Sequence, residues 1–171
     1  MYDTYFEAFA GLKDYFAACF NMCDKYQYLE YSPITGRKYF FSFANPYFHN
    51  KDIINDYGFR YNKDAKTIQS DSDKAKSEIQ KLSQNYRIQG TSADISKIAG
   101  VYIMNKLIRR NLLWTVKIVN MVHDEFIVEC PDDIAEEVGQ VVVTSMREAG
   151  KPFCKIIPLD ASLDIGKYWI H

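Results

Sequence analysis

The sequence predicts an α+β fold in which an antiparallel sheet is backed by helices. Two apolar stretches, 115–122 and 126–130, flank the short segment His123-Asp124-Glu125 and are typical of a β-hairpin. Several longer segments repeat apolar residues every three or four positions, the pattern of amphipathic helices. With 171 residues, 47% of them hydrophobic, the chain is long enough for one domain with a core or for a large piece of a bigger protein.

The first 41 residues predict a helix followed by two strands. Residues 1–25 carry aromatic and apolar side chains at spacings of three and four, interpreted as core packing: Tyr5, Phe9, Leu12, Phe16 and Phe20. Residues 26–41, YQYLEYSPITGRKYFF, predict two short strands around a Pro-Ile-Thr-Gly turn. Residues 42–70 are polar and weakly patterned, and they predict a long loop or a small insertion.

Residues 71–112 predict two further helices. The first ends near Asn85, and a break over 86–90 separates it from the second. Thr91 and Asp94, three residues apart, fit the capping-box pattern that opens a helix. The apolar face of this second helix continues to about Arg110.

Residues 113–171 predict the hairpin, a helix and a final strand. Pro131 stops the second strand and suits the first turn of the helix, which we expect to end near Gly150. Alternating apolar residues then predict the final strand: Leu159, Ala161, Leu163 and Ile165.

Charge and cysteine content narrow the protein class. The net charge of −1 gives no argument for nucleic acid or membrane. Five basic residues and no acid lie between Lys97 and Lys117, and seven acids without Lys or Arg lie between Asp124 and Met146. We interpret these runs as two solvated faces of opposite sign. The four cysteines form no CxxC pair and predict buried free thiols, in preference to zinc ligands or disulfides, in a reducing compartment. Without a signal peptide or a long apolar run, we expect an intracellular protein that does not enter a membrane.

The adjacent acids Asp124 and Glu125 are the candidate chemical site. Ionised carboxylates leave water only at a cost of several kcal/mol unless they are compensated, and a divalent cation compensates two at once. Mg²⁺ prefers a few carboxylates together with water and phosphate oxygens. Adjacent strand residues point to opposite faces, so we expect only one of the two acids to be a direct ligand. The alternative is a solvent-exposed turn whose acids only maintain solubility.

Two other segments suggest contacts to nucleic acid. Asn85 and Gln89 carry amides that can donate to minor-groove acceptors, which lie at similar places in every base pair. Taken alone, such residues are more often loop caps. Arg37 and Lys38 in TGRK are able to bind phosphate but are equally plausible as surface charges.

Together, these segments resemble the C-terminal part of family A DNA polymerases, particularly phage-like members. YFEAFAGLKDYF is similar to the helix that follows the fingers motif, and QYLEYSPITGRK to the strands with a GRR or GRK segment. NYRIQGTSADISKIAG resembles the N-x-P-x-QG-[ST] junction, and MVHDEFIVECP resembles palm motif C. The final Trp-x-His matches the usual terminus. The resemblance implies the C-terminal part of a right-hand polymerase fold, in which residues 113–171 carry the palm hairpin and 71–112 contact DNA.

The resemblance also implies roles for individual residues. Asp124 matches the metal-binding catalytic aspartate of motif C, and Glu125 its supporting acid. His123, Gln89, Asn85, Lys81 and Arg37 fall at DNA-contacting positions. Lys81 stands where the family usually has arginine, so the bidentate contact is lost. Arg87 stands where the family usually has proline, and this is a second difference from the family pattern.

The implied activity is template-directed DNA polymerisation, in which Mg²⁺ ions assist transfer of a nucleotide from a dNTP to the primer 3′-hydroxyl. Family members also use an upstream motif A aspartate and a fingers helix, and neither motif occurs in this sequence. We therefore expect the chain alone to be inactive and to need an upstream polymerase segment or subunit. The chain is then one part of a split enzyme, a fragment of a longer polymerase or the product of a decayed gene. We expect it in the cytoplasm of a bacterial or phage-infected cell. The alternative is a non-catalytic DNA-binding palm module.

Overall fold

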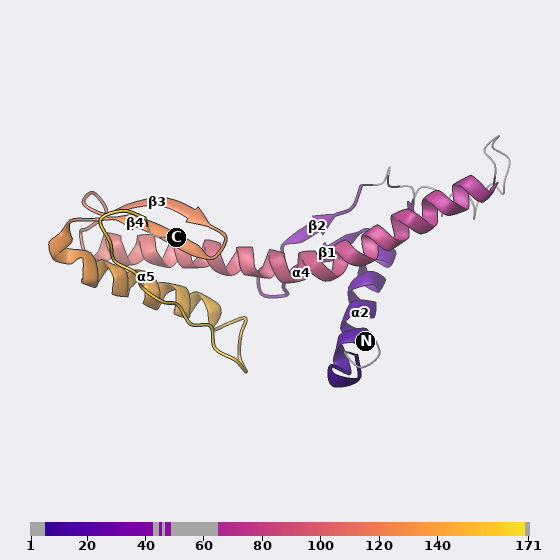
Figure 1. Cartoon of the computed structure of the whole chain (residues 1–171), viewed down its shortest axis with the longest axis horizontal. Coiled ribbons are helices and arrows are strands. Elements are labelled where there is room, and N and C mark those ends of the chain that lie inside the picture. Colours follow the sequence, from indigo (N-terminus) through magenta and orange to yellow (C-terminus); the bar gives the residue numbers. More distant parts are fainter. Residues whose placement is uncertain (1–5, 43–44, 46, 49–64, 170–171) are drawn as a thin grey trace. The chain divides into compact units, whose positions relative to one another are not determined.

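The computed structural model describes residues 6–42, 45, 47–48 and 65–169 (Figure 1). Contacts divide the chain into two compact units, 1–90 and 91–171. The strands form two separate two-stranded antiparallel sheets, one in each unit. The predicted α+β composition is therefore confirmed, whereas the described residues contain no larger sheet that joins all the strands.

The first unit begins with a helix and a hairpin. Residues 6–8 are helical, and helix α2 (Gly11–Tyr26) follows after a turn. Strands β1 (Tyr28–Glu30) and β2 (Lys38–Phe40) pair antiparallel, with Leu29 opposite Tyr39. The predicted helix and strands are thus present, although Tyr5 lies outside the described residues.

The core of the first unit contains cysteines as well as aromatic residues. Its buried members are Cys19, Cys23, Leu29, Phe41, Phe48 and Ile79. Phe9, expected in the core, is instead 57% exposed. All four cysteines are free thiols, but the predicted burial holds only for Cys19 and Cys23, because Cys130 and Cys154 are half-buried. Burial raises the pKa of the Cys23 thiol to about 12, so this side chain behaves as a neutral apolar group.

Helix α4 (Ala65–Arg109) is one uninterrupted helix of 45 residues, and the predicted break over 86–90 is wrong. Arg87, unlike proline, keeps its backbone N–H for the helix ladder. Gly90 provides a close approach to a neighbouring side chain: a Cβ added there would lie 2.4 Å from the Tyr31 ring. Thr91 and Asp94 lie inside the helix and do not cap it. The predicted loop over 42–70 is also shorter at its end, because 65–70 are helical, and 49–64 lie outside the described residues.

The second unit packs strands β3 (Lys117–Val122) and β4 (Glu125–Glu129), a short 3₁₀ helix η1 (Asp132–Ile134) and helix α5 (Ala135–Gly150) with the end of α4. Its buried core comes from α4, the segment before β3, and α5: Ile103, Leu107, Val116, Val138, Val141 and Val142. The predicted hairpin and the helix after Pro131 are therefore confirmed.

The predicted final strand over 159–165 is wrong, since these residues have no strand conformation. The segment instead runs beside α5 (Figure 1). Added Cβ atoms at Gly139 and Gly150 would lie 2.5 Å from Leu163 and 2.8 Å from Leu159, which shows how closely the leucines approach this helix. Ala161 and Leu163 are half-buried, whereas Leu159 and Ile165 are 42% and 52% exposed, so packing against the helix accounts for the middle of the alternation only.

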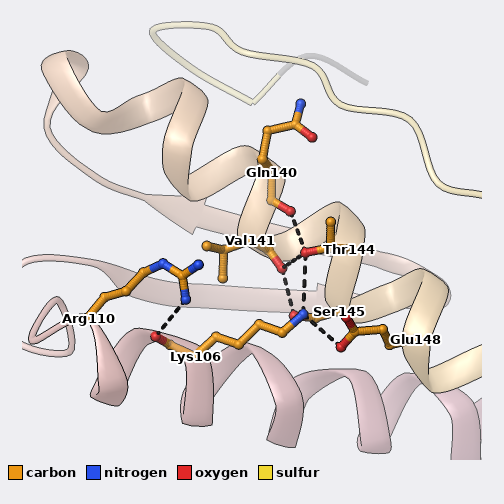
Figure 2. A network of polar contacts seen from close by, with 7 residues as sticks. All are labelled: Lys106, Arg110, Gln140, Val141, Thr144, Ser145 and Glu148. Atoms are coloured by element: carbon orange, nitrogen blue, oxygen red, sulfur yellow. Dashed lines mark hydrogen bonds and ion pairs between the residues drawn. The ribbon is translucent and has the colours of Figure 1, made fainter.

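Among the described residues, two ion pairs connect α4 with α5, and one of them, Arg110–Glu137, joins the two charge runs, whose members remain largely exposed to solvent. Lys106 Nζ lies 2.8 Å from Glu148 Oε2 and donates to Thr144 Oγ1 at 3.3 Å (Figure 2). Arg110 Nε lies 3.6 Å from Glu137 Oε1. The hydrogen bond from Lys106 lowers the pKa of the Glu148 carboxyl.

Candidate functional site

The hairpin tip holds the candidate acids in a tight two-residue turn. Val122 pairs with Glu125, which leaves only His123 and Asp124 between the strands. His123 has a φ of 52°, in the left-handed region that few residues other than glycine adopt. This conformation costs on the order of 1–2 kcal/mol. Two-residue hairpin loops require positive φ, so the tight turn explains why this residue is strained.

A bulge in β3 sets which side chains face which way near the tip. Ile118 pairs with Val128 and Asn120 with Ile127, so Val119 is an extra residue in the ladder. Such an insertion reverses the alternation of side chains along the strand that contains it. Val119 is accordingly 58% exposed, although it follows the half-buried Ile118 in the strand.

Asp124 and Glu125 have different surroundings. The Asp124 side chain is exposed, and no hydrogen bond or ion pair to its carboxylate occurs within the described part of the chain. Glu125 is half-buried, and its Oε1 accepts a hydrogen bond from Trp169 Nε1 at 2.9 Å. The structure thus leaves one acid open to solvent and fixes the other against the C-terminal segment.

Helix α4 packs against the hairpin that carries the turn. Ser96 is 7% exposed, and its Oγ lies 3.1 Å from the Ser92 carbonyl oxygen and 3.4 Å from the His123 carbonyl oxygen. Gly100 brings the helix close to the hairpin, because a Cβ there would contact the Phe126 ring at 3.5 Å. The turn therefore rests on a rigid element.

The oxygen donors at the tip fit a hard cation such as Mg²⁺ but supply only part of its ligands. Among the described residues, no group of three or more His, Cys, Asp or Glu side chains converges in a way that holds a metal. Asp124 is the side chain available for such an ion, and Glu125 is held by Trp169.

The candidate DNA-contacting residues of the first unit form one exposed row on α4. Lys81, Asn85 and Gln89 are four residues apart, so they lie on the same face of the helix over about 12 Å. All three side chains are exposed, and none has a polar partner among the residues that the structure describes. Sequence reasoning missed this row because it placed a break between the two amides.

The arginines of this unit that lie within the described residues, Arg37 and Arg87, are engaged in packing. An Arg37 Nη donates to the Gly90 carbonyl oxygen at 3.0 Å, and its guanidinium lies 4.4 Å from the centre of the Tyr31 ring. Arg87 reaches Cys19 Sγ at 3.8 Å, and its guanidinium lies 5.6 Å from the centre of the Tyr15 ring. Both guanidiniums stabilise the first unit in this structure.

The described helices include none with the length and apolar character needed to cross a bilayer.

Comparisons with known proteins give the family. The sequence model of DNA polymerase family A matches residues 1–171. DNA polymerase I of Aquifex aeolicus is 40% identical over 85 residues, which cover 50% of this chain and 14% of that protein. DNA polymerase I of Borreliella burgdorferi is 33% identical over 104 residues, covering 61% of this chain and 11% of that protein.

DNA polymerase theta of Drosophila melanogaster is 28% identical over 173 aligned positions, which cover 98% of this chain and 7% of that protein. The chain therefore spans between 7% and 14% of the length of these three relatives. Because the family match extends over every residue of the sequence, the chain belongs to DNA polymerase family A.

Proposed function

We propose that this chain is the C-terminal portion of a template-directed DNA polymerase, and that Asp124 is its catalytic carboxylate. The observation that carries the proposal is the exposed Asp124 carboxylate on a tight turn, supported by α4 and placed beside Glu125. Rigid support is what a catalytic group needs to keep its geometry. The palm assignment for residues 113–171 and the phage-like character belong to the same proposal.

In the proposed reaction, the primer 3′-oxygen attacks the α-phosphate of a dNTP. A new P–O bond forms, the bond to pyrophosphate breaks, and the 3′-hydroxyl loses its proton. Bound Mg²⁺ would lower the pKa of that hydroxyl and neutralise charge on the leaving oxygens. Asp124 would hold the ion, while Glu125, fixed by Trp169, would help to position the turn. His123 at the same turn would lie near the primer end.

The exposed row of Lys81, Asn85 and Gln89 would contact primer-template DNA. The two amides can donate to minor-groove acceptors of any base pair, and the ammonium can pair with a phosphate. We propose a smaller role for Arg37 in DNA contact than the resemblance implies, because its guanidinium already binds Gly90 and stacks on Tyr31.

The chain would act with an upstream polymerase segment or subunit that supplies motif A and the fingers helix. Exposed apolar side chains of the second unit support such a partner. On β3 these are Val119 and Met121, and on α4 they are Val101, Met104 and Ile108, each at least 38% exposed. By this proposal the isolated chain is inactive, and the complex acts in the cytoplasm of a bacterial or phage-infected cell.

Reconstitution tests the proposal. The chain is mixed with a separately expressed segment that carries motif A and the fingers, and Mg²⁺-dependent primer extension is measured. We expect extension from the mixture only, and a loss of at least about 100-fold with Asp124→Asn, since that change removes a metal-holding charge. Asp133→Asn, an acid outside the turn, is the matched control and should keep full activity. Equal extension by wild type and Asp124→Asn would refute the catalytic assignment.

A second candidate is a DNA-binding module without catalysis. It is favoured by the incomplete metal-ligand set of the described residues and by the exposed amide row. Metal-independent DNA binding, together with no extension in any reconstituted mixture, would support this candidate.

A further inference from the structure

The β1–β2 hairpin has two chemically different faces. Leu29 and Tyr39 pair across the strands; Leu29 is fully buried and Tyr39 packs against the core of the first unit. The residues before and after them in the strands point the other way. On this outer face Tyr28 pairs with Phe40, and Glu30 pairs with Lys38.

A left-handed residue brings a third ring to this outer face. Gln27 ends α2 with a φ of 56°, and its N–H donates to the Cys23 carbonyl oxygen at 2.9 Å. The chain therefore turns sharply from helix to strand, and Tyr26 stacks on Tyr28 with ring centroids 5.5 Å apart and an interplanar angle of 22°. The Tyr28 and Phe40 centroids are 5.7 Å apart, so the three rings are consecutive neighbours.

Two lysines accompany these exposed rings. Phe40 is 68% exposed and Tyr26 is 50% exposed. Lys38 Nζ lies 4.2 Å from the Tyr28 centroid, and Lys25 Nζ lies 4.9 Å from the Tyr26 centroid. Within the described ranges, neither ammonium forms an ion pair with a carboxylate. We call Tyr26, Tyr28, Phe40, Lys25 and Lys38 the aromatic–lysine face.

We propose that the aromatic–lysine face binds single-stranded DNA. Every base has a π-face, so exposed rings stack on unpaired bases without a preference for sequence. Long flexible lysine side chains beside such rings can follow the phosphate backbone. Glu30 is the acidic residue of the two paired strands, and it lies opposite Lys38 in the strand register. The face therefore has two lysines and one glutamate, and its net charge is positive. An apolar protein partner would gain nothing from these two ammonium groups.

The test measures binding of the full chain to a fluorescein-labelled oligothymidine by anisotropy. EDTA is present, so that binding does not depend on Asp124 or on any metal. We expect the double change Tyr26→Ala and Phe40→Ala to weaken binding about tenfold or more, as removal of stacking rings does elsewhere. The double change Tyr26→Phe and Phe40→Tyr keeps both rings and should restore wild-type affinity. Phe9→Ala, which removes a different exposed ring of the same unit, should have no effect.

Salt dependence tests the lysines. On single strands, each neutralised phosphate contributes about 0.7 to the slope of log affinity against log salt. Lys25→Ala with Lys38→Ala should therefore lower the slope by about 1.4, whereas Lys155→Ala should leave it unchanged. Equal affinity of wild type and the ring-deleted variant, or an unchanged slope without the two lysines, would overturn the proposal. Failure here leaves the primer-extension result untouched, so the two proposals fail separately.

Discussion

Arg87→Pro tests whether α4 continues through the junction. Proline inside a helix removes one N–H from the ladder and places its ring against the carbonyl four residues earlier, at a cost of about 3 kcal/mol or more. The substitution also removes the guanidinium that lies 5.6 Å from the Tyr15 ring, a contact of about 0.5–1 kcal/mol. We expect a loss of about 4 kcal/mol, a large share of the roughly 5–15 kcal/mol that stabilises a domain.

Urea unfolding followed by far-UV circular dichroism measures this loss. Arg87→Ala is the matched control: it deletes the same contacts, keeps the backbone N–H, and should cost about 1 kcal/mol or less. The difference between the two variants isolates the backbone term. If Arg87→Pro were as stable as Arg87→Ala and kept the same helical signal, α4 would be interrupted at this point and the reasoning would be refuted.

Two further predictions concern the second unit. Glu148→Gln should cost less than about 1 kcal/mol, because the carboxylate paired with Lys106 is 44% exposed. Since the folded state lowers the pKa of Glu148 below 4.5, wild type should lose this contribution as the pH falls below about 4.5, and the variant should show a flatter pH dependence of unfolding free energy there. Gly139→Ala places a Cβ 2.5 Å from Leu163, so limited proteolysis should cut the C-terminal segment faster than in wild type. Gly11→Ala, with nothing within 4 Å, should leave the cleavage rate unchanged. If Gly139→Ala and wild type were cleaved at equal rates, the packing of the C-terminal segment on α5 would be contradicted.

The sequence predicted the elements that depend on local pattern. The hairpin around Asp124 is evident because apolar runs on both sides of a polar turn bury one face. The helix after Pro131 follows from its start signals and its apolar spacing. These features need only neighbouring residues, and the structure confirms both.

The sequence-based predictions were wrong where one sequence feature is compatible with two different structures. Gly90 is typical of a helix end, but here it admits the Tyr31 ring against a continuous helix. Alternating apolar residues near the C-terminus predict a strand, yet a segment without strand pairing that lies against a helix also half-buries alternate residues, here Ala161 and Leu163. Only the identity of the packing partner separates these cases, and the local sequence does not contain it.

The continuity of α4 through residues 86–90 changes how the exposed polar row of Lys81, Asn85 and Gln89 is arranged. In a broken helix, Asn85 and Gln89 would each take an independent direction. In a continuous helix, the backbone fixes them and Lys81 on one face with a spacing of about 6 Å per four residues. A preorganised row loses less conformational entropy on binding than separate loop side chains. Because Arg87 keeps its backbone N–H, the helix ladder continues past it, and one helix carries all three residues of the proposed DNA-contacting row.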